Sequence, residues 1–139
     1  MRRVILASHG SLAEGALDTL HMIVGPVEGV YAFSLRRDDV ESVSDRVRAL
    51  LGTFSPDDRV FVVTDMVGSS VNNDMVGLLA AHPEITLLSG LNMPLVLGLV
   101  LNEDLGGPAL GQTIDTAREN IKNCSLAISE AEDDEGDDL

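Results

Sequence analysis

Two polar side chains that could act together, His9 and Asp65, each follow an apolar run of the strand type. A carboxylate that accepts the Nδ1–H of an imidazole fixes its tautomer and leaves the Nε2 lone pair free as a nucleophile. Serine hydroxyls and backbone amides nearby would stabilise an anionic group on that nitrogen. The chemistry indicated is transfer of a phosphoryl group through His9. The alternative is that His9 makes only a loop hydrogen bond while Asp65 caps a helix.

The elements that must position these residues alternate between strand and helix patterns, which is typical of an α/β fold with a parallel sheet. Short apolar runs predict strands at residues 4–7, 30–35, 59–64 and 85–88. Apolar residues at helical spacing predict helices at residues 12–24, 70–81, 94–101 and 109–121. A further helix is predicted before Gly52, with Asp39 or Ser42 as its N-terminal cap. The fold class predicted is a three-layer, flavodoxin-like α/β fold.

The position of the site follows from the order of the strands. In the flavodoxin-like order 2-1-3-4, the carboxyl ends of the first and third strands are neighbours, so His9 and Asp65 meet in one crevice. Small and hydroxyl-bearing residues follow both of them at predicted helix N-termini, where unpaired backbone N–H groups favour an anion. These residues are the predicted phosphate-binding set: Gly10, Ser11, Gly68, Ser69 and Ser70.

Length and charge restrict the class of protein. The 139 residues, 45% of them hydrophobic, suffice for one core, and no apolar run is long enough for a membrane span. Without an export signal the expected location is the cytoplasm. A net charge of −14 disfavours nucleic acid and anionic lipid as partners. Residues 130–139 carry seven acids and no base, which predicts a disordered acidic tail after a domain at residues 1–129.

The sequence pattern of the segment before the tail predicts a fifth strand. Between residues 124 and 129, Cys124, Leu126 and Ile128 alternate with smaller or polar residues, which is the pattern of a half-exposed strand. Cys124 is the only cysteine, so no internal disulfide is possible.

Other residues are assigned more ordinary roles. His21 is read as a structural residue on a helix face and His82 as a helix C-terminal cap. Arg36 and Arg37 follow the second strand, where they could touch a phosphate or an acidic partner or simply be solvated. No metal and no cofactor are expected.

Three motifs resemble one known family, the mannose-type EIIA component of the bacterial phosphotransferase system (PTS). Residues 5–10, Ile-Leu-Ala-Ser-His-Gly, match its first motif. Residues 64–73, Thr-Asp-Met-Val-Gly-Ser-Ser-Val-Asn-Asn, resemble its Asp-x-x-Gly-Gly-Ser/Thr-Pro-x-Asn loop, and residues 90–94, Gly-Leu-Asn-Met-Pro, resemble its third signature. The resemblance extends from residue 1 to about residue 129.

The resemblance implies a function and partners. His9 would take a phosphoryl group from the carrier HPr and pass it to a cognate EIIB, with an indirect link to the membrane components EIIC and EIID. Asp65 would orient His9, and Ser70 would contact the phosphoryl group. The family also implies a homodimer with a C-terminal strand, here residues 124–129, that is exchanged between subunits and antiparallel to the sheet.

The second motif departs from the family at two positions. Ser69 stands where a second glycine is usual, which removes freedom for positive φ, and Val71 replaces a proline that would preset φ at a helix start. Neither change touches His9, Asp65 or Ser70.

Two alternative functions use similar residues. A regulatory module on the same fold, such as the phosphotransfer subunit of a dihydroxyacetone kinase or a domain that controls transcription, would also carry a phosphoryl group. A chelatase can also end its first strand in His-Gly-Ser, but it needs a second metal-binding histidine or an acid cluster, for which His21 and His82 are poorly placed.

Overall fold

The structure is a computed structural model that describes residues 1–137, with four strands and six helices within that range. The strands are β1 (Arg2–His9), β2 (Val30–Leu35), β3 (Arg59–Thr64) and β4 (Thr86–Ser89). The helices are α1 (Leu12–Val24), α2 (Val43–Leu51), α3 (Ser70–Leu78), α4 (Met93–Leu101), α5 (Gly107–Glu119) and α6 (Cys124–Asp137).

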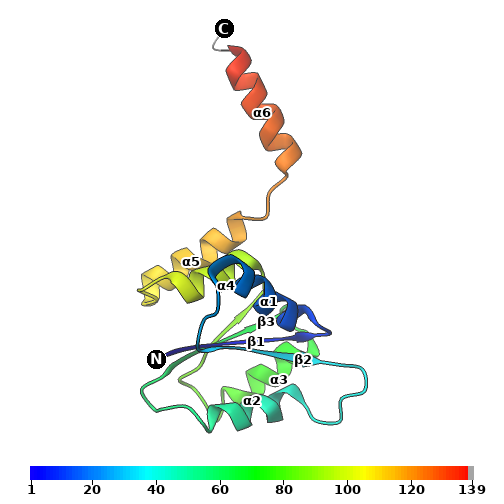
Figure 1. The fold of residues 1–139 in the computed structure, drawn as a ribbon, viewed down its shortest axis with the longest axis vertical. Coiled ribbons are helices and arrows are strands. Elements are labelled where there is room, and N and C mark those ends of the chain that lie inside the picture. The colour runs from blue at the N-terminus through cyan, green and yellow to red at the C-terminus, as the bar shows by residue number, and fades with distance from the viewer. Residues whose placement is uncertain (138–139) are drawn as a thin grey trace.

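The sheet is parallel throughout and has the order β2-β1-β3-β4, which confirms the predicted topology. Helices α1 and α4 cover one face, α2 and α3 cover the other, and α5 packs against α4 (Figure 1). Alternate residues of β1 supply the two apolar cores. Val4 and Leu6 face α1 and α4, whereas Ile5 and Ala7 face α2 and α3. Strand β1 is thus covered on both faces, as its continuous apolar run predicts.

Side-chain caps set the beginnings of three helices. Ser42 accepts a hydrogen bond from the backbone N–H of Asp45 and begins α2, which decides between the two predicted caps in favour of Ser42. Ser69 begins α3 in the same way, and Asn92 begins α4. Each cap satisfies a backbone donor that the helix itself cannot pair.

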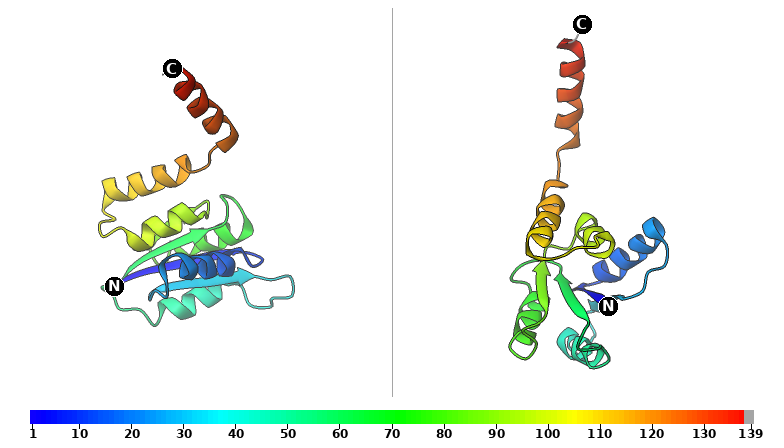
Figure 2. Two further views of the ribbon diagram at one scale, coloured as in Figure 1. Left: turned by 45° about the horizontal axis from the view of Figure 1, so that its top comes forward. Right: turned by 90° about the vertical axis from the view of Figure 1, so that its left-hand side faces the viewer.

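The predicted fifth strand is wrong for the chain as described, because residues 124–129 lie in α6. A strand satisfies its backbone groups only beside another strand, whereas a helix satisfies them within its own segment. Without a paired neighbour, the alternation of Cys124, Leu126 and Ile128 does not make a strand. Figure 1 and both views of Figure 2 show α6 pointing away from the sheet, and residues 124–133 are all exposed.

The predicted acidic tail overlaps the end of this helix. Residues 130–137 continue α6, and the last two residues of the predicted tail, 138 and 139, lie outside the described residues. Within residues 1–137, no helix combines the length and apolar character needed to cross a bilayer.

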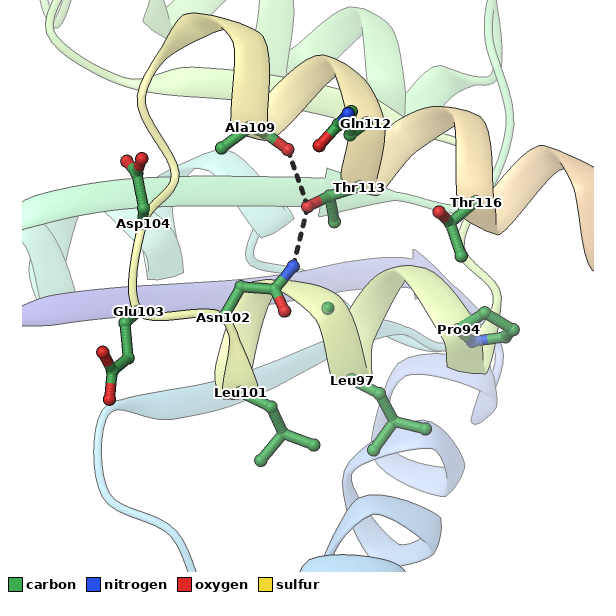
Figure 3. Close-up of a pocket in the computed structure, with 11 residues that line it drawn as sticks. Pro94, Leu97, Leu101, Asn102, Glu103, Asp104, Ala109, Gln112, Thr113 and Thr116 are labelled. Carbon is green, nitrogen blue, oxygen red and sulfur yellow. Dashed lines mark hydrogen bonds between the residues drawn. The ribbon is translucent and has the colours of Figure 1, made fainter.

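A cavity of about 610 Å³ lies between α4 and α5 (Figure 3). Asn102 donates to the hydroxyl of Thr113 over 2.9 Å, and that hydroxyl donates to the carbonyl of Ala109 over 3.0 Å. Leu97 and Leu101 of α4 are also among the residues that line it. None of the predicted site residues lines this cavity.

Candidate active site

His9 and Asp65 meet at the carboxyl edge of the sheet, as predicted. His9 is the last residue of β1, and Asp65 directly follows β3, the neighbouring strand. Oδ2 of Asp65 lies 2.8 Å from Nδ1 of His9 and accepts the backbone N–H of the same residue over 2.9 Å. One carboxylate oxygen therefore holds both the ring and the backbone of His9. This contact selects the Nδ1–H tautomer and leaves the lone pair on Nε2.

The other oxygen of Asp65 is held by its own loop. Oδ1 accepts the backbone N–H of Met66 over 2.9 Å and the hydroxyl of Ser69 over 2.8 Å. Burial by itself would raise the pKa of Asp65, but the hydrogen bonds from His9, Ser69 and Met66 outweigh it and lower the pKa to about 2. Asp65 is therefore a carboxylate at neutral pH, which suits it to orient an imidazole.

Nε2 of His9 faces the hydroxyl of Ser70. The distance from Nε2 to Oγ of Ser70 is 2.8 Å, so in the Nδ1–H tautomer the hydroxyl donates to the Nε2 lone pair. The His9 side chain is 46% exposed, whereas that of Asp65 is only 11% exposed. The imidazole is thus accessible from solvent while its carboxylate partner is shielded.

The five predicted phosphate-binding residues take different positions. Ser70 is exposed beside Nε2, and Ser11 is exposed at the start of α1 with its side chain not engaged in capping. The backbone N–H of Gly10 donates to the carbonyl of Leu35, and that of Gly68 donates to Oδ1 of Asn72. Ser69 is buried and turned towards Asp65.

A polar network behind the loop was not predicted from the sequence. Asn72, 7% exposed, donates from Nδ2 to the hydroxyl of Thr64 over 2.9 Å. The hydroxyl of Thr64 donates in turn to that of Ser89 on β4 over 2.9 Å. Since Asn72 also accepts from Gly68, this network ties the loop after β3 to the sheet. Thr64 and Ser89, at the ends of β3 and β4, were the only sign of this network in the sequence. Their hydrogen-bond partners depend on the path of the loop.

The remaining sequence candidates make their side-chain contacts with residues other than His9 or are exposed. Arg36 pairs with Glu14 over 2.6 Å, and both side chains are largely exposed. Arg37 and His21 are also exposed. His82 lies 3.2 Å from Glu84, and its backbone N–H closes the turn after α3 on the carbonyl of Leu78. Among residues 1–133, whose side chains the structure describes, no three His, Cys, Asp or Glu side chains gather as a metal site would require.

The fold and the site place one oriented imidazole at the carboxyl edge of a parallel sheet. A family model described as the PTS system fructose IIA component (EIIA-man) matches residues 3–118. The chain therefore belongs to the mannose-type EIIA family of the phosphotransferase system.

Individual relatives agree with this family. The sorbose-specific PTS EIIA component of Klebsiella pneumoniae is 30% identical over 103 residues, covering 74% of this chain and 76% of the relative. A crystal structure from Klebsiella pneumoniae, described as a phosphoenolpyruvate-dependent sugar PTS permease, has a TM-score of 0.81 and 33% identity, covering 91% of this chain and 93% of its own. The phosphotransferase system component EIIA of Streptococcus agalactiae has a TM-score of 0.73 and 26% identity, with coverage of 91% and 99%.

The lowered pKa of Asp65 predicts a loss of stability in acid. Between its ordinary value of 3.8 and the folded value of about 2, the unfolded chain binds more protons at this site than the folded chain. The contribution of Asp65 to the free energy of unfolding is therefore complete above pH 4 and disappears as the pH falls to about 2. We expect it to be about 1 kcal/mol after solvent screening.

Urea unfolding at neutral pH and at about pH 3 measures this contribution. Asp65→Asn should lose less stability between the two conditions than the unchanged protein. Asp58, whose pKa is also lowered to about 2, titrates in the same range and is present in both proteins. Equal losses in the two proteins would show that Asp65 does not contribute.

Proposed function

We propose that this chain is a phosphoryl carrier of a sugar phosphotransferase system, which takes the group from phospho-HPr onto Nε2 of His9 and gives it to a cognate EIIB. The observation that carries the proposal is the 2.8 Å contact between Nδ1 of His9 and Oδ2 of Asp65, with Nε2 free of any carboxylate. We expect this relay in the cytoplasm, with its link to the EIIC and EIID membrane components made through EIIB.

The transfer of the phosphoryl group needs no reactant other than the two proteins. The Nε2 lone pair of His9 attacks the phosphorus of a phosphohistidine on HPr, and a new N–P bond forms as the donor's N–P bond breaks. The electron pair of the broken bond returns to the donor imidazole, which leaves as a neutral ring because its other nitrogen keeps its proton. The proton on Nδ1 of His9 stays between that atom and Asp65. The second transfer, to EIIB, repeats these changes with His9 as the donor.

Ser70 would change partner during the reaction. Its hydroxyl donates to Nε2 before transfer and must release that lone pair for attack on phosphorus. The same hydroxyl can then donate to an oxygen of the bound phosphoryl group, which keeps a charge-assisted hydrogen bond in the product. Among the predicted phosphate-binding residues, Ser70 and Ser11 are the exposed hydroxyls best suited to contact the anion.

The surface around His9 supports a protein rather than a small molecule as the donor. Leu12 is 52% exposed, Met66 is 63% exposed and Val67 is 83% exposed, and all three lie on the segments that follow His9 or Asp65. Exposed apolar side chains that gather around a reactive group indicate an interface that is buried when a partner docks. Donor and acceptor proteins would use this surface in turn.

Labelling with enzyme I, HPr and phosphoenolpyruvate tests the proposal. We expect one acid-labile phosphoryl group per chain, with the ³¹P signal of an Nε2-phosphoimidazole. Purified EIIB from the same operon should then remove the label, and sorbose is the first sugar to test because of the relative named above. A chain that takes no label contradicts the proposal. Discharge to a dihydroxyacetone kinase subunit but not to EIIB would favour the regulatory alternative.

We further propose a homodimer, as the family resemblance implies, in which α6 takes part. Leu126 and Ile128 on α6 are 55% and 61% exposed, and the described part of the chain leaves both of them largely uncovered. Deletion of residues 130–139 should leave the dimer and the labelling rate unchanged, because this segment adds little apolar surface. Deletion of residues 124–139 should give a folded monomer, because residues 124–133 lie outside both cores.

Light scattering and thermal unfolding of both truncated proteins check this prediction. A dimer that persists without residues 124–139 would exclude α6 from the interface. A full-length chain that is monomeric would contradict the homodimer itself.

A further inference from the structure

Ser69 occupies a position where the family motif usually has glycine, and the structure gives its side chain two hydrogen bonds. Its hydroxyl donates to Oδ1 of Asp65 over 2.8 Å and accepts the backbone N–H of Asn72 over 3.1 Å. The residue has φ −66° and ψ 162°, an extended conformation that serine adopts without strain. At 8% exposure the hydroxyl is too enclosed to serve a phosphoryl group on His9.

The contact with Asp65 has a consequence for His9. The carboxylate can rotate about its Cβ–Cγ bond unless both oxygens are held. Oδ2 is held by His9, while Oδ1 is held by the N–H of the adjacent residue, Met66, and by Ser69. The bond from Met66 is local to the same turn. The bond from Ser69 is the one that ties Oδ1 to the first turn of α3, where Ser70 also lies.

We propose that Ser69 is a positioning residue for His9: its hydroxyl fixes the plane of the Asp65 carboxylate, so that Oδ2 holds Nδ1–H while Nε2 faces Ser70. Ser69 thereby links the two residues that contact the imidazole. This inference rests on the proposed phosphoryl transfer for its kinetic effect, but its effect on the tautomer of His9 exists in the protein without phosphate.

A purely structural role of Ser69 as a helix cap is separable from this one. Glycine is nearly as good as serine at an N-cap, so Ser69→Gly removes the hydroxyl with little loss of helix stability. Ser42 provides the matched control, since its hydroxyl caps α2 by the same bond, 3.1 Å long, and it makes no contact with Asp65. Ser69→Thr retains a hydroxyl and should restore the contact.

The experiment measures the His9 tautomer by ¹⁵N NMR at a pH where the ring is neutral, and then the rate of phosphorylation by phospho-HPr. In Ser69→Gly we expect a larger fraction of the Nε2–H tautomer and a rate lower by about tenfold or more, the effect of one hydrogen bond to a charged group. Ser69→Thr should return both values to those of the unchanged protein. Ser42→Gly should leave both unchanged.

Two results would overturn the inference. One is a tautomer fraction and rate in Ser69→Gly that equal those of the unchanged protein, which would leave Ser69 as a cap alone. The other is an equal change in Ser42→Gly, which would trace the effect to helix ends in general. If neither the unchanged protein nor any variant accepts the phosphoryl group, the proposed function fails. The tautomer measurement still decides whether Ser69 positions His9.

Discussion

Asp65→Asn is expected to slow phosphorylation of His9 by a factor on the order of 10² or more, by analogy with the aspartate of catalytic triads. An amide has one acceptor oxygen and one NH₂ group, so it cannot accept hydrogen bonds on both sides as the carboxylate does. An NH₂ group facing His9 would donate to Nδ1 and favour the tautomer in which Nε2 carries the proton. The Nε2 lone pair would then be unavailable for attack on phosphorus.

Single-turnover labelling measures this effect, and Asp58→Asn is its matched control. Asp58 is also a shielded carboxylate with a pKa lowered to about 2, but it pairs with the N-terminal amine and Arg3. We expect Asp58→Asn to reduce stability and to leave the labelling rate unchanged. If Asp65→Asn labels at the normal rate while remaining folded, Asp65 has no part in the transfer.

His9→Ala is expected to abolish labelling completely. His9 is the only one of the three histidines that ends a strand beside a carboxylate and a helix N-terminus, whereas His21 lies on α1 and His82 follows α3. The change should leave the fold intact, because the His9 side chain is half exposed and belongs to neither core. Circular dichroism and mass spectrometry of the labelled protein provide the two measurements.

His21→Ala and His82→Ala are the controls, and both should accept one phosphoryl group per chain. Stoichiometric labelling of His9→Ala would place the phosphoryl group on another residue. Loss of labelling in either control, with the fold retained, would show that His9 does not act alone.

The sheet and the His9–Asp65 contact could be predicted from the sequence because both follow from strand order. Continuous apolar runs place β1 and β3 inside the sheet, and the carboxyl ends of adjacent parallel strands necessarily share an edge. No side-chain geometry was needed to bring the two residues together.

The roles of Gly10, Gly68 and Ser69 could not be predicted in the same way. Whether a loop N–H or hydroxyl faces an anion or turns into the protein depends on the path of a few residues. In this loop, Asn72 takes the N–H of Gly68, and the hydroxyl of Ser69 turns to Asp65. Spacing along the chain carries no information about such choices.

The secondary structure of residues 124–137 was also beyond the sequence pattern. Alternation at Cys124, Leu126 and Ile128 favours a strand, while the acidic residues and alanines that follow are compatible with a helix. Which one forms depends on whether a strand partner is present, and that is a property of the surroundings rather than of the segment.

The location of His9 on a central strand bears on the entropy of the reaction. Its backbone is paired with Leu35 on one side and bonded to Asp65 on the other, so the imidazole is carried by backbone that is held on both sides. Little conformational freedom remains to be lost when a donor arrives, and ordering of the acceptor adds little to the barrier. For the proposed carrier we therefore expect a transfer rate governed by diffusion and mutual orientation of two proteins, which respond to solvent viscosity and ionic strength rather than to internal motion.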